Sequence, residues 1–387
     1  MFRCSFDLQQ TPPMSQLFSP YTLRGLTLRN RTVVAPMCQY TARHGYANDW
    51  HLVHLGRFAI GGFGLVILEA TGVNPEGRIS YGDLGLWEDG QIEPLKRIVD
   101  FLKAEGSAAG IQLAHAGRKA ATPIAWRHGF DETEADKIEY AYETWVPVAP
   151  SAEAHSSNPN FQTPHALDKA GIESLITDFV SATRRAEAAG FDLIEIHAAH
   201  GYLINQFLSP LANHRTDEYG GSRENRMRLL LEITDAVRTA WPEDKPLVVR
   251  ISATDGRPDG WSIEDSVVLA GELKARGVDV VHVSSGGFDG ASIKPGPLYQ
   301  VPFARAVRQA GVPTMAVGLI DAPEDAERII TDGDADFVAF ARTALDDPNW
   351  PIHALHALEG GTYDLWPKQA RNRMRDKDRA LGRHQPA

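Results

Sequence analysis

The chain has 387 residues, 43% of them hydrophobic, which is enough to bury a large core in one big domain or in two or three ordinary ones. Its 39 basic and 50 acidic side chains give a net charge of −11, which argues against nucleic acid or an anionic membrane surface as a partner. Two cysteines are too few for a disulfide framework or a four-thiolate iron–sulfur cluster. The sequence has neither the apolar core of a signal peptide nor an apolar stretch long enough to span a membrane, and we therefore expect a cytoplasmic protein.

The first elements along the chain are an extension and a hairpin. Met14 is followed by SQLFSPY and can serve as an alternative start. We therefore expect residues 1–13 to be a disordered extension and residues 14–387 to form a single domain. Residues 21–30, YTLRGLTLRN, alternate in polarity around Arg24 and Gly25, which predicts a β-hairpin.

Eight short apolar runs then recur along the chain. Continuous Val, Ile and Leu residues are typical of strands buried on both faces, as in a parallel sheet. The runs end at Ala35, Glu69, Leu113, His197, Ser252, Ser284, Val317 and Phe340.

Amphipathic segments separate many of these runs. Eight alternations of strand and helix favour a closed (β/α)8 TIM barrel of the α/β class over an open doubly wound sheet. The hairpin would then close the lower mouth of the barrel. The expected helices span residues 92–104, 172–188, 224–240, 263–275 and 323–331, and glycines at C-cap positions follow four of these segments: Gly106, Gly190, Gly277 and Gly333.

One connection is far longer than the others. Residues 121–164, after the third strand, are rich in charge, proline and aromatic side chains. A loop of this length is a lid or binding element, or else it is disordered, and we favour a lid. Trp126, Tyr142 and Trp145 either line its entrance or are surface aromatics.

A barrel gathers its working groups on the loops at the carboxyl ends of its strands. Taken singly, these groups have other interpretations: Cys38 can be an inert buried thiol, and His197 and His200 can be a structural pair or metal ligands. Their spacing is not that of a helical HExxH motif, and no carboxylate or cysteine stands nearby, so we do not expect a metal. The groups at the strand ends are Cys38, Tyr40, Gln112, Lys119, His197, His200, Tyr202, Arg250, Gly318 and Arg342.

Three segments carry a specific pattern in a fixed order. They are APMCQY at 35–40, IQLAHAGRKA at 111–120 and EIHAAHGYLINQFLSPLANHRTDEYGGSRENR at 195–226. Together they resemble the old yellow enzyme family, in the bacterial branch whose barrels carry a cysteine near the flavin. The resemblance runs from about Leu17 to Asp347. It implies a TIM barrel, tightly bound FMN, NADPH or NADH as hydride donor, and ene-reductase activity.

The resemblance also implies positions for the flavin. A guanidinium beside the pyrimidine edge stabilises the negative charge of the reduced ring, and the alternative for Arg250 is an inward salt bridge. Ala341 replaces the glycine found in many relatives, and its N–H can still donate if φ stays negative. The implied flavin neighbours are Pro36, Met37, Cys38 and Ala70 against the ring, Gln112 and Arg250 at its pyrimidine side, and Ser284, Gly286, Gly318, Ala341 and Arg342 around the phosphate.

The substrate residues follow in the same way. His197 and His200 resemble paired donors to the carbonyl or nitro oxygen of an electron-poor alkene, and Tyr202 matches the proton donor to its α-carbon. Cys38 and Tyr40 match residues that shape the pocket and tune the flavin. Lys119 either matches a family lysine near the ribityl or phosphate region or is an ordinary loop lysine.

The implied function is reduction of activated C=C bonds in α,β-unsaturated carbonyl or nitro compounds. The alternatives are a flavin barrel that acts mainly on other electrophiles such as nitro compounds, and a barrel that binds a ligand without turnover. Relatives of this branch insert an arginine from the segment that corresponds to residues 365–375 into a neighbouring subunit. We therefore expect a dimer or tetramer, with Arg371 and Arg373 both candidates for that arginine.

Overall fold

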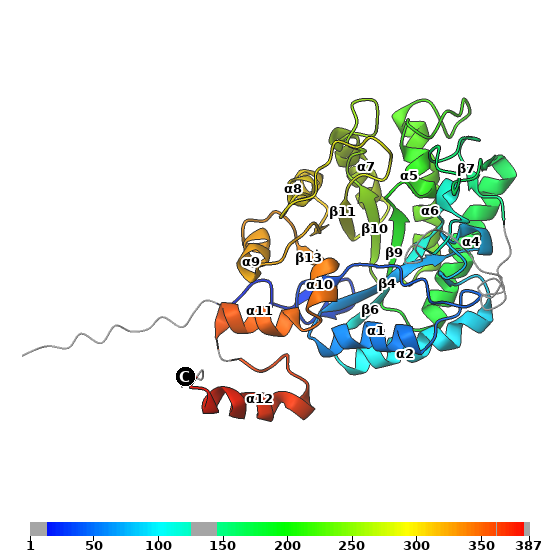
Figure 1. Ribbon diagram of the computed structural model, residues 1–387. Coiled ribbons are helices and arrows are strands. Elements are labelled where there is room, and N and C mark those ends of the chain that lie inside the picture. Colours follow the sequence, from blue (N-terminus) through cyan, green and yellow to red (C-terminus); the bar gives the residue numbers. More distant parts are fainter. Residues whose placement is uncertain (1–13, 125–144, 361, 383–387) are drawn as a thin grey trace, which may run out of the picture.

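The structure is a computed structural model that describes residues 14–124, 145–360 and 362–382 (Figure 1). The expected extension at 1–13 and the middle of the long loop, with Trp126 and Tyr142, lie outside the described residues. Within the described part of the chain, no helix is long and apolar enough to cross a membrane.

Eight parallel strands form a closed ring. The ring closes because the first strand pairs on one side with the second and on the other side with the last. This closure confirms the predicted TIM barrel. In order around the ring the strands are β3 (Thr32–Val34), β4 (Leu65–Gly72), β6 (Ala108–Ala114), β9 (Leu193–Ala198), β10 (Leu247–Ser252), β11 (Val280–Ser284), β12 (Thr314–Ala316) and β13 (Phe337–Phe340).

Helices surround this ring (Figure 1). Their apolar faces pack on the outward side chains of the strands in one continuous core. The main helices are α1 (Asp49–Ile60), α2 (Ile92–Ala104), α4 (Lys169–Ala188), α6 (Arg223–Ala240), α7 (Ile263–Ala275), α8 (Val301–Arg308), α9 (Pro323–Thr331) and α11 (Trp350–Glu359). Shorter helices are α5 (Leu203–Leu208) and α10 (Arg342–Asp346), and short strands are β5 (Leu84–Gly85), β7 (Val148–Ala149) and β8 (His165–Ala166).

The helix ends follow local capping chemistry. Helices α2, α7 and α9 have the predicted bounds, whereas α4 begins before Ile172 because the Asp168 side chain accepts a hydrogen bond from the Gly171 N–H. Ser222 caps α6 by accepting a hydrogen bond from the Asn225 N–H. The end of the segment 195–226 therefore forms the first turn of α6. Gly106 and Gly190 end α2 and α4 with φ of 81° and 86°, values that favour glycine.

The predicted N-terminal hairpin is present as β1 (Tyr21–Leu23) and β2 (Leu26–Leu28). Leu23 and Leu28 join a buried cluster with inward side chains of the barrel strands, and the Tyr21 ring lies 4.8 Å from the Phe337 ring. The hairpin therefore closes the amino end of the barrel, opposite the face where the strands end.

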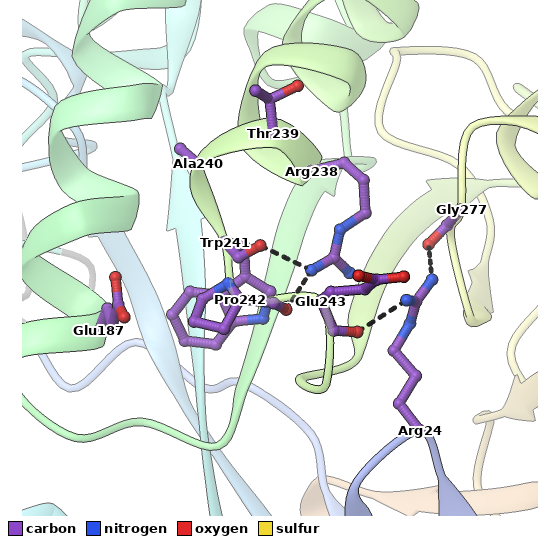
Figure 2. Close-up of a pocket in the computed structure, with 9 residues that line it drawn as sticks. All are labelled: Arg24, Glu187, Arg238, Thr239, Ala240, Trp241, Pro242, Glu243 and Gly277. Carbon is purple, nitrogen blue, oxygen red and sulfur yellow. Dashed lines mark hydrogen bonds between the residues drawn. The ribbon is translucent and has the colours of Figure 1, made fainter.

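A cavity of about 610 Å³ lies beside this hairpin (Figure 2). Its guanidinium groups are engaged within the protein: Arg24 donates to the Glu243 carbonyl oxygen at 2.8 Å, and Arg238 donates to the Lys245 carbonyl oxygen at 3.0 Å. Arg24 also pairs with Asp279 at 2.7 Å. These contacts anchor the hairpin turn to the loops that precede β10 and β11.

The last helix, α12 (Lys368–Ala380), lies below α11 at the edge of the molecule (Figure 1). It buries none of its side chains, and Arg371 within it donates to the Asp364 carbonyl oxygen at 2.7 Å. The dimer or tetramer expected from this segment stays a prediction.

If the hairpin stabilises the barrel, Leu28→Ala should lower the free energy of unfolding by roughly 2–5 kcal/mol, because Leu28 is 1% exposed in the closing cluster. Leu381→Ala makes the same chemical change at a residue that is 55% exposed and should cost less than about 0.5 kcal/mol. Urea denaturation followed by circular dichroism measures both. Equal losses would contradict the packing described for the hairpin.

Candidate active site

The two histidines lie at the end of β9. His197 points into the barrel, and His200 follows in the next turn with φ of 60°, a strained value for a residue other than glycine. The Ser252 hydroxyl accepts from the His200 N–H at 2.9 Å, and the Lys119 ammonium donates to the His200 carbonyl oxygen at 2.8 Å. Contacts from two other strand-end loops thus hold His200 in this conformation.

Both imidazoles are neutral. Burial, and after it the charge of Arg250, holds the pKa of each ring well below its usual range. The His197 Nδ1 accepts from the Ala199 N–H at 3.2 Å, so the proton of that ring is on Nε2. This Nε2 lies 3.4 Å from the His200 Nδ1, and the two ring atoms therefore face one small region.

Ser284, at the end of β11, contacts the other side of His200. Its hydroxyl oxygen lies 2.8 Å from the His200 Nε2 and 3.2 Å from the Gln300 Oε1. The hydroxyl donates to the Gln300 Oε1 and so accepts from the His200 Nε2–H; it can serve the other neutral tautomer of His200 only by turning away from Gln300.

Tyr202 lies beside the histidine pair, with its ring 5.0 Å from the His197 ring. Burial, together with the nearby Cys38 and Asp83, raises the pKa of Tyr202, so the phenol stays protonated. Tyr202 and Ala70 both line a small closed hollow with Asp83. The structure therefore brings together residues from β4, from the β9 turn and from the loop before β5.

Cys38 and Tyr40 occupy the loop after β3. The Glu69 carboxylate accepts from the Gln39 N–H at 2.8 Å and so ties this loop to β4. The Cys38 and Tyr40 side chains hydrogen-bond to each other, and burial raises the pKa of both groups. Cys38 is therefore a neutral thiol.

Arg250, on β10, is buried in the barrel with 7% exposure. Its Nε has no hydrogen-bond partner among the described residues, although a buried guanidinium ordinarily has several. Arg250 lines a cavity of about 180 Å³, and a cation with an unpartnered Nε–H at a cavity wall fits an electron-rich or anionic ligand.

The far wall of this cavity comes from the loops after β12 and β13. Gly318 has φ of 129°, and an added Cβ would lie 3.1 Å from the Gln300 backbone nitrogen, so the loop needs glycine there. Ala341 has φ of −116°, which meets the condition for its N–H to donate. With Ser284 and Arg342 also lining the cavity, four of the five expected phosphate neighbours meet at one wall.

The fifth, Gly286, differs. Its N–H donates to the Thr254 carbonyl oxygen at 2.9 Å, and its own carbonyl accepts from the Ser252 hydroxyl at 2.6 Å. Both backbone groups of Gly286 are thus engaged in positioning loops, and it is not among the residues that line the cavity. Pro36 and Met37 lie, partly exposed, just after β3.

Lys119 follows β6 in the short helix η3 (Gly117–Lys119). Its ammonium donates to the carbonyl oxygens of His200 and Gly287, both at 2.8 Å. It thereby ties three strand-end loops together and lies 5.6 Å from the centre of the Tyr202 ring.

Two buried carboxylates near the site were not predicted from the sequence. Asp83 lies near Cys38 and Tyr202, and burial, with the neighbouring Glu69, raises its pKa to about 7. Glu195 is fully buried and accepts from the Gln112 amide at 2.7 Å. Glu195 stands two residues before His197 on the same strand, so alternation of strand faces would have placed it inside the barrel. Asp83 lies in the loop before β5 and carries no such signal.

Within the described residues, no group of three or more histidine, cysteine, aspartate or glutamate side chains is arranged to hold a metal ion.

Comparison with known proteins places the chain in a family. The profile of the NADH:flavin oxidoreductase / NADH oxidase family matches residues 16–360. The chain belongs to this family. An NADPH dehydrogenase from Geobacillus thermodenitrificans is 49% identical over 345 residues, which cover 88% of this chain and 94% of that protein.

Solved structures agree with this assignment. Morphinone reductase superposes with a TM-score of 0.73 at 30% identity, covering 89% of this chain and 90% of its own, and an old yellow enzyme homologue from Zymomonas mobilis gives 0.73 at 26% identity, covering 91% and 96%. A 2-naphthoyl-CoA reductase gives 0.78 at 27% identity over 90% of this chain, which spans only 53% of that longer chain. The protein is an FMN-dependent oxidoreductase of the old yellow enzyme type that uses a nicotinamide nucleotide.

Lys119 makes the stability of this site depend on pH. Burial lowers its pKa from 10.5 to about 8, so between these values the unfolded chain binds more protons than the folded one. The free energy of unfolding should therefore rise with pH over this window, by up to about 1.4 kcal/mol per unit. Below pH 8 this slope should vanish, because Lys119 is then protonated in both states. Lys119→Met should show a smaller slope in urea titrations at pH 8 to 10.5; identical slopes would contradict the buried position.

Proposed function

We propose that this protein reduces the C=C bond of α,β-unsaturated carbonyl or nitro compounds, with the nicotinamide nucleotide as electron source. The observation that carries the proposal is the neutral His197–His200 pair, whose facing ring nitrogens lie 3.4 Å apart beside the protonated Tyr202. Two N–H donors directed at one point and a nearby acid suit an acceptor whose oxygen gains charge while its carbon takes up a proton.

The proposed flavin site is the cavity that Arg250 lines together with the loops after β12 and β13. Arg250 and Gln112 would meet the pyrimidine side of FMN, and the backbone N–H groups near Gly318, Ala341 and Arg342 would meet its phosphate. The unpartnered Nε of Arg250 supports this assignment. When bound, FMN supplies two-electron transfer between the nucleotide and the acceptor.

The histidines bind and polarise the acceptor. The His197 Nε2–H is one donor to the acceptor oxygen, and His200 is the second when its proton is on Nδ1. In that tautomer the Ser284 hydroxyl turns away from the Gln300 Oε1, to which it donates in this structure, and donates instead to the His200 Nε2, which lies 2.8 Å away. Neutral rings suit this task, since they donate without adding a cation to a site that already holds Arg250. Each donor is typically worth about 2.7–4 kcal/mol.

Tyr202 is the proposed proton donor to the α-carbon, since its raised pKa keeps the hydroxyl protonated across neutral pH. Cys38 is a neutral thiol that shapes the pocket beside Tyr40 and is not a nucleophile.

Replacing either His197 or His200 by Ala should slow reoxidation of the reduced enzyme by 2-cyclohexenone about 10²–10³-fold. The double variant should lose less than the product of the two effects, because both donors act on one oxygen. Reduction by NADPH should be less impaired, since no oxyanion develops in that half-reaction. Stopped-flow absorbance separates the two half-reactions, with His353→Ala as the control at an exposed histidine. A double variant that reoxidises as fast as the parent rules out this role.

Tyr202→Phe keeps the ring against His197 and removes only the hydroxyl. Acceptor binding should persist, while protonation of the α-carbon should slow unless water replaces the phenol. The kcat of steady-state turnover should therefore fall more than KM rises. A variant with unchanged kcat would assign the proton to another donor.

A further inference from the structure

A buried polar cluster lies beneath the histidine pair. Four strands that are consecutive around the barrel, β6, β9, β10 and β11, each contribute one inward side chain to it. Glu195 is the centre: its Oε1 accepts from the Gln112 Nε2 at 2.7 Å, and its Oε2 lies 2.8 Å from the His282 Nδ1. The four residues are Gln112, Glu195, Arg250 and His282, with exposures of 2%, 0%, 7% and 0%.

The charges within this cluster follow from the contacts. Burial alone would raise the pKa of Glu195. The contact with His282, the charge of Arg250 and the hydrogen bond from Gln112 outweigh burial, so the pKa is lowered. Burial, with the charge of Arg250, lowers the pKa of His282. Glu195 is therefore a carboxylate, and His282 is a neutral ring whose Nδ1–H donates to it.

A carboxylate accepts hydrogen bonds and donates none. Its contact with Gln112 therefore has to be made by the amide nitrogen, which decides how that amide is oriented. This orientation leaves the carbonyl Oε1 and the second hydrogen of Nε2 for a ligand, so Gln112 offers an acceptor to the flavin site at a fixed position.

The same carboxylate acts on Arg250. Glu195 is the largest influence that favours the charged form of the buried guanidinium, and Arg250 forms no hydrogen bond at Nε within the described residues. The field that Arg250 exerts in the cavity is thus reduced by a negative charge on the neighbouring strand.

We propose that Glu195, held by His282, is a positioning residue for the flavin: it fixes Gln112 as an acceptor and offsets part of the Arg250 charge, which limits the preference of the site for the reduced cofactor. This inference rests on the proposed function, in which Gln112 and Arg250 face the pyrimidine side of FMN. A two-electron-reduced flavin carries negative charge there, so the net charge of the cluster sets how much more tightly reduced FMN binds than oxidised FMN.

The test compares Glu195→Gln with Asp255→Asn. Both changes replace a buried carboxylate with an isosteric amide. The Asp255 carboxylate, however, accepts hydrogen bonds from Ser209 and Trp261, which lie outside the cluster. In Glu195→Gln the ratio of the dissociation constants of oxidised and reduced FMN should rise about tenfold, equivalent to about 30 mV in the two-electron potential. Asp255→Asn should leave this ratio at the parent value even if it costs as much stability.

Fluorescence titration with FMN and spectroelectrochemical titration of the loaded proteins give these quantities without turnover. Glu195→Asp separates the two roles: it keeps the charge, so the ratio should stay within about threefold of the parent value. Its shorter side chain loses the Gln112 contact, which should raise the dissociation constant of oxidised FMN about fivefold, as expected for one hydrogen bond of about 1 kcal/mol.

A Glu195→Gln protein that binds FMN with the parent ratio overturns the inference while leaving the proposed function intact. If Glu195→Gln does not fold, Glu195→Asp decides, and an unchanged affinity for oxidised FMN overturns the inference. A parent protein that binds no FMN instead overturns the proposed site itself, so the two failures are distinct.

Discussion

The pairing of β3 with both β4 and β13 is the constraint on which the site depends. Because it closes the parallel sheet, residues separated by some three hundred positions in the chain, such as Tyr40 and Arg342, reach one face of the molecule. The hairpin fills the opposite mouth, which leaves the carboxyl ends of the strands as the place where polar side chains and loops gather. Hydrogen bonds made by Lys119, Ser252 and Glu69 then hold the loops of this face in position.

Burial at this face also sets the charges that the chemistry requires. It keeps His197 and His200 neutral and Tyr202 protonated, while Arg250 retains the support of the Glu195 carboxylate. A chain with a net charge of −11 thus holds a cation at the wall of its active-site cavity. The neutral donors and the protonated acid both follow from burial, whereas the cation near the flavin position persists despite burial, with the support of the Glu195 carboxylate.

Much of this organisation was predictable from sequence because it depends on local pattern. Apolar runs and capping residues defined the eight strands and several helices, and family motifs identified the strand-end side chains. Helix α1 was not predicted, since His51 and other polar residues interrupt its apolar positions, and the partner of His51, Glu69, lies on a neighbouring strand. Glu195 and Asp83 were missed for the same physical reason: their importance comes from side chains brought close only by the closed barrel.

A crystal structure of the protein with FMN and 2-cyclohexenone tests the central claim most directly. The account predicts the pyrimidine edge of FMN within hydrogen-bond distance of the Gln112 Oε1 and the Arg250 guanidinium, its phosphate at the Gly318 and Arg342 loops, and the enone oxygen between His197 and His200. An enone oxygen bound away from both imidazoles, or an FMN ring that leaves Arg250 without a partner, would contradict it.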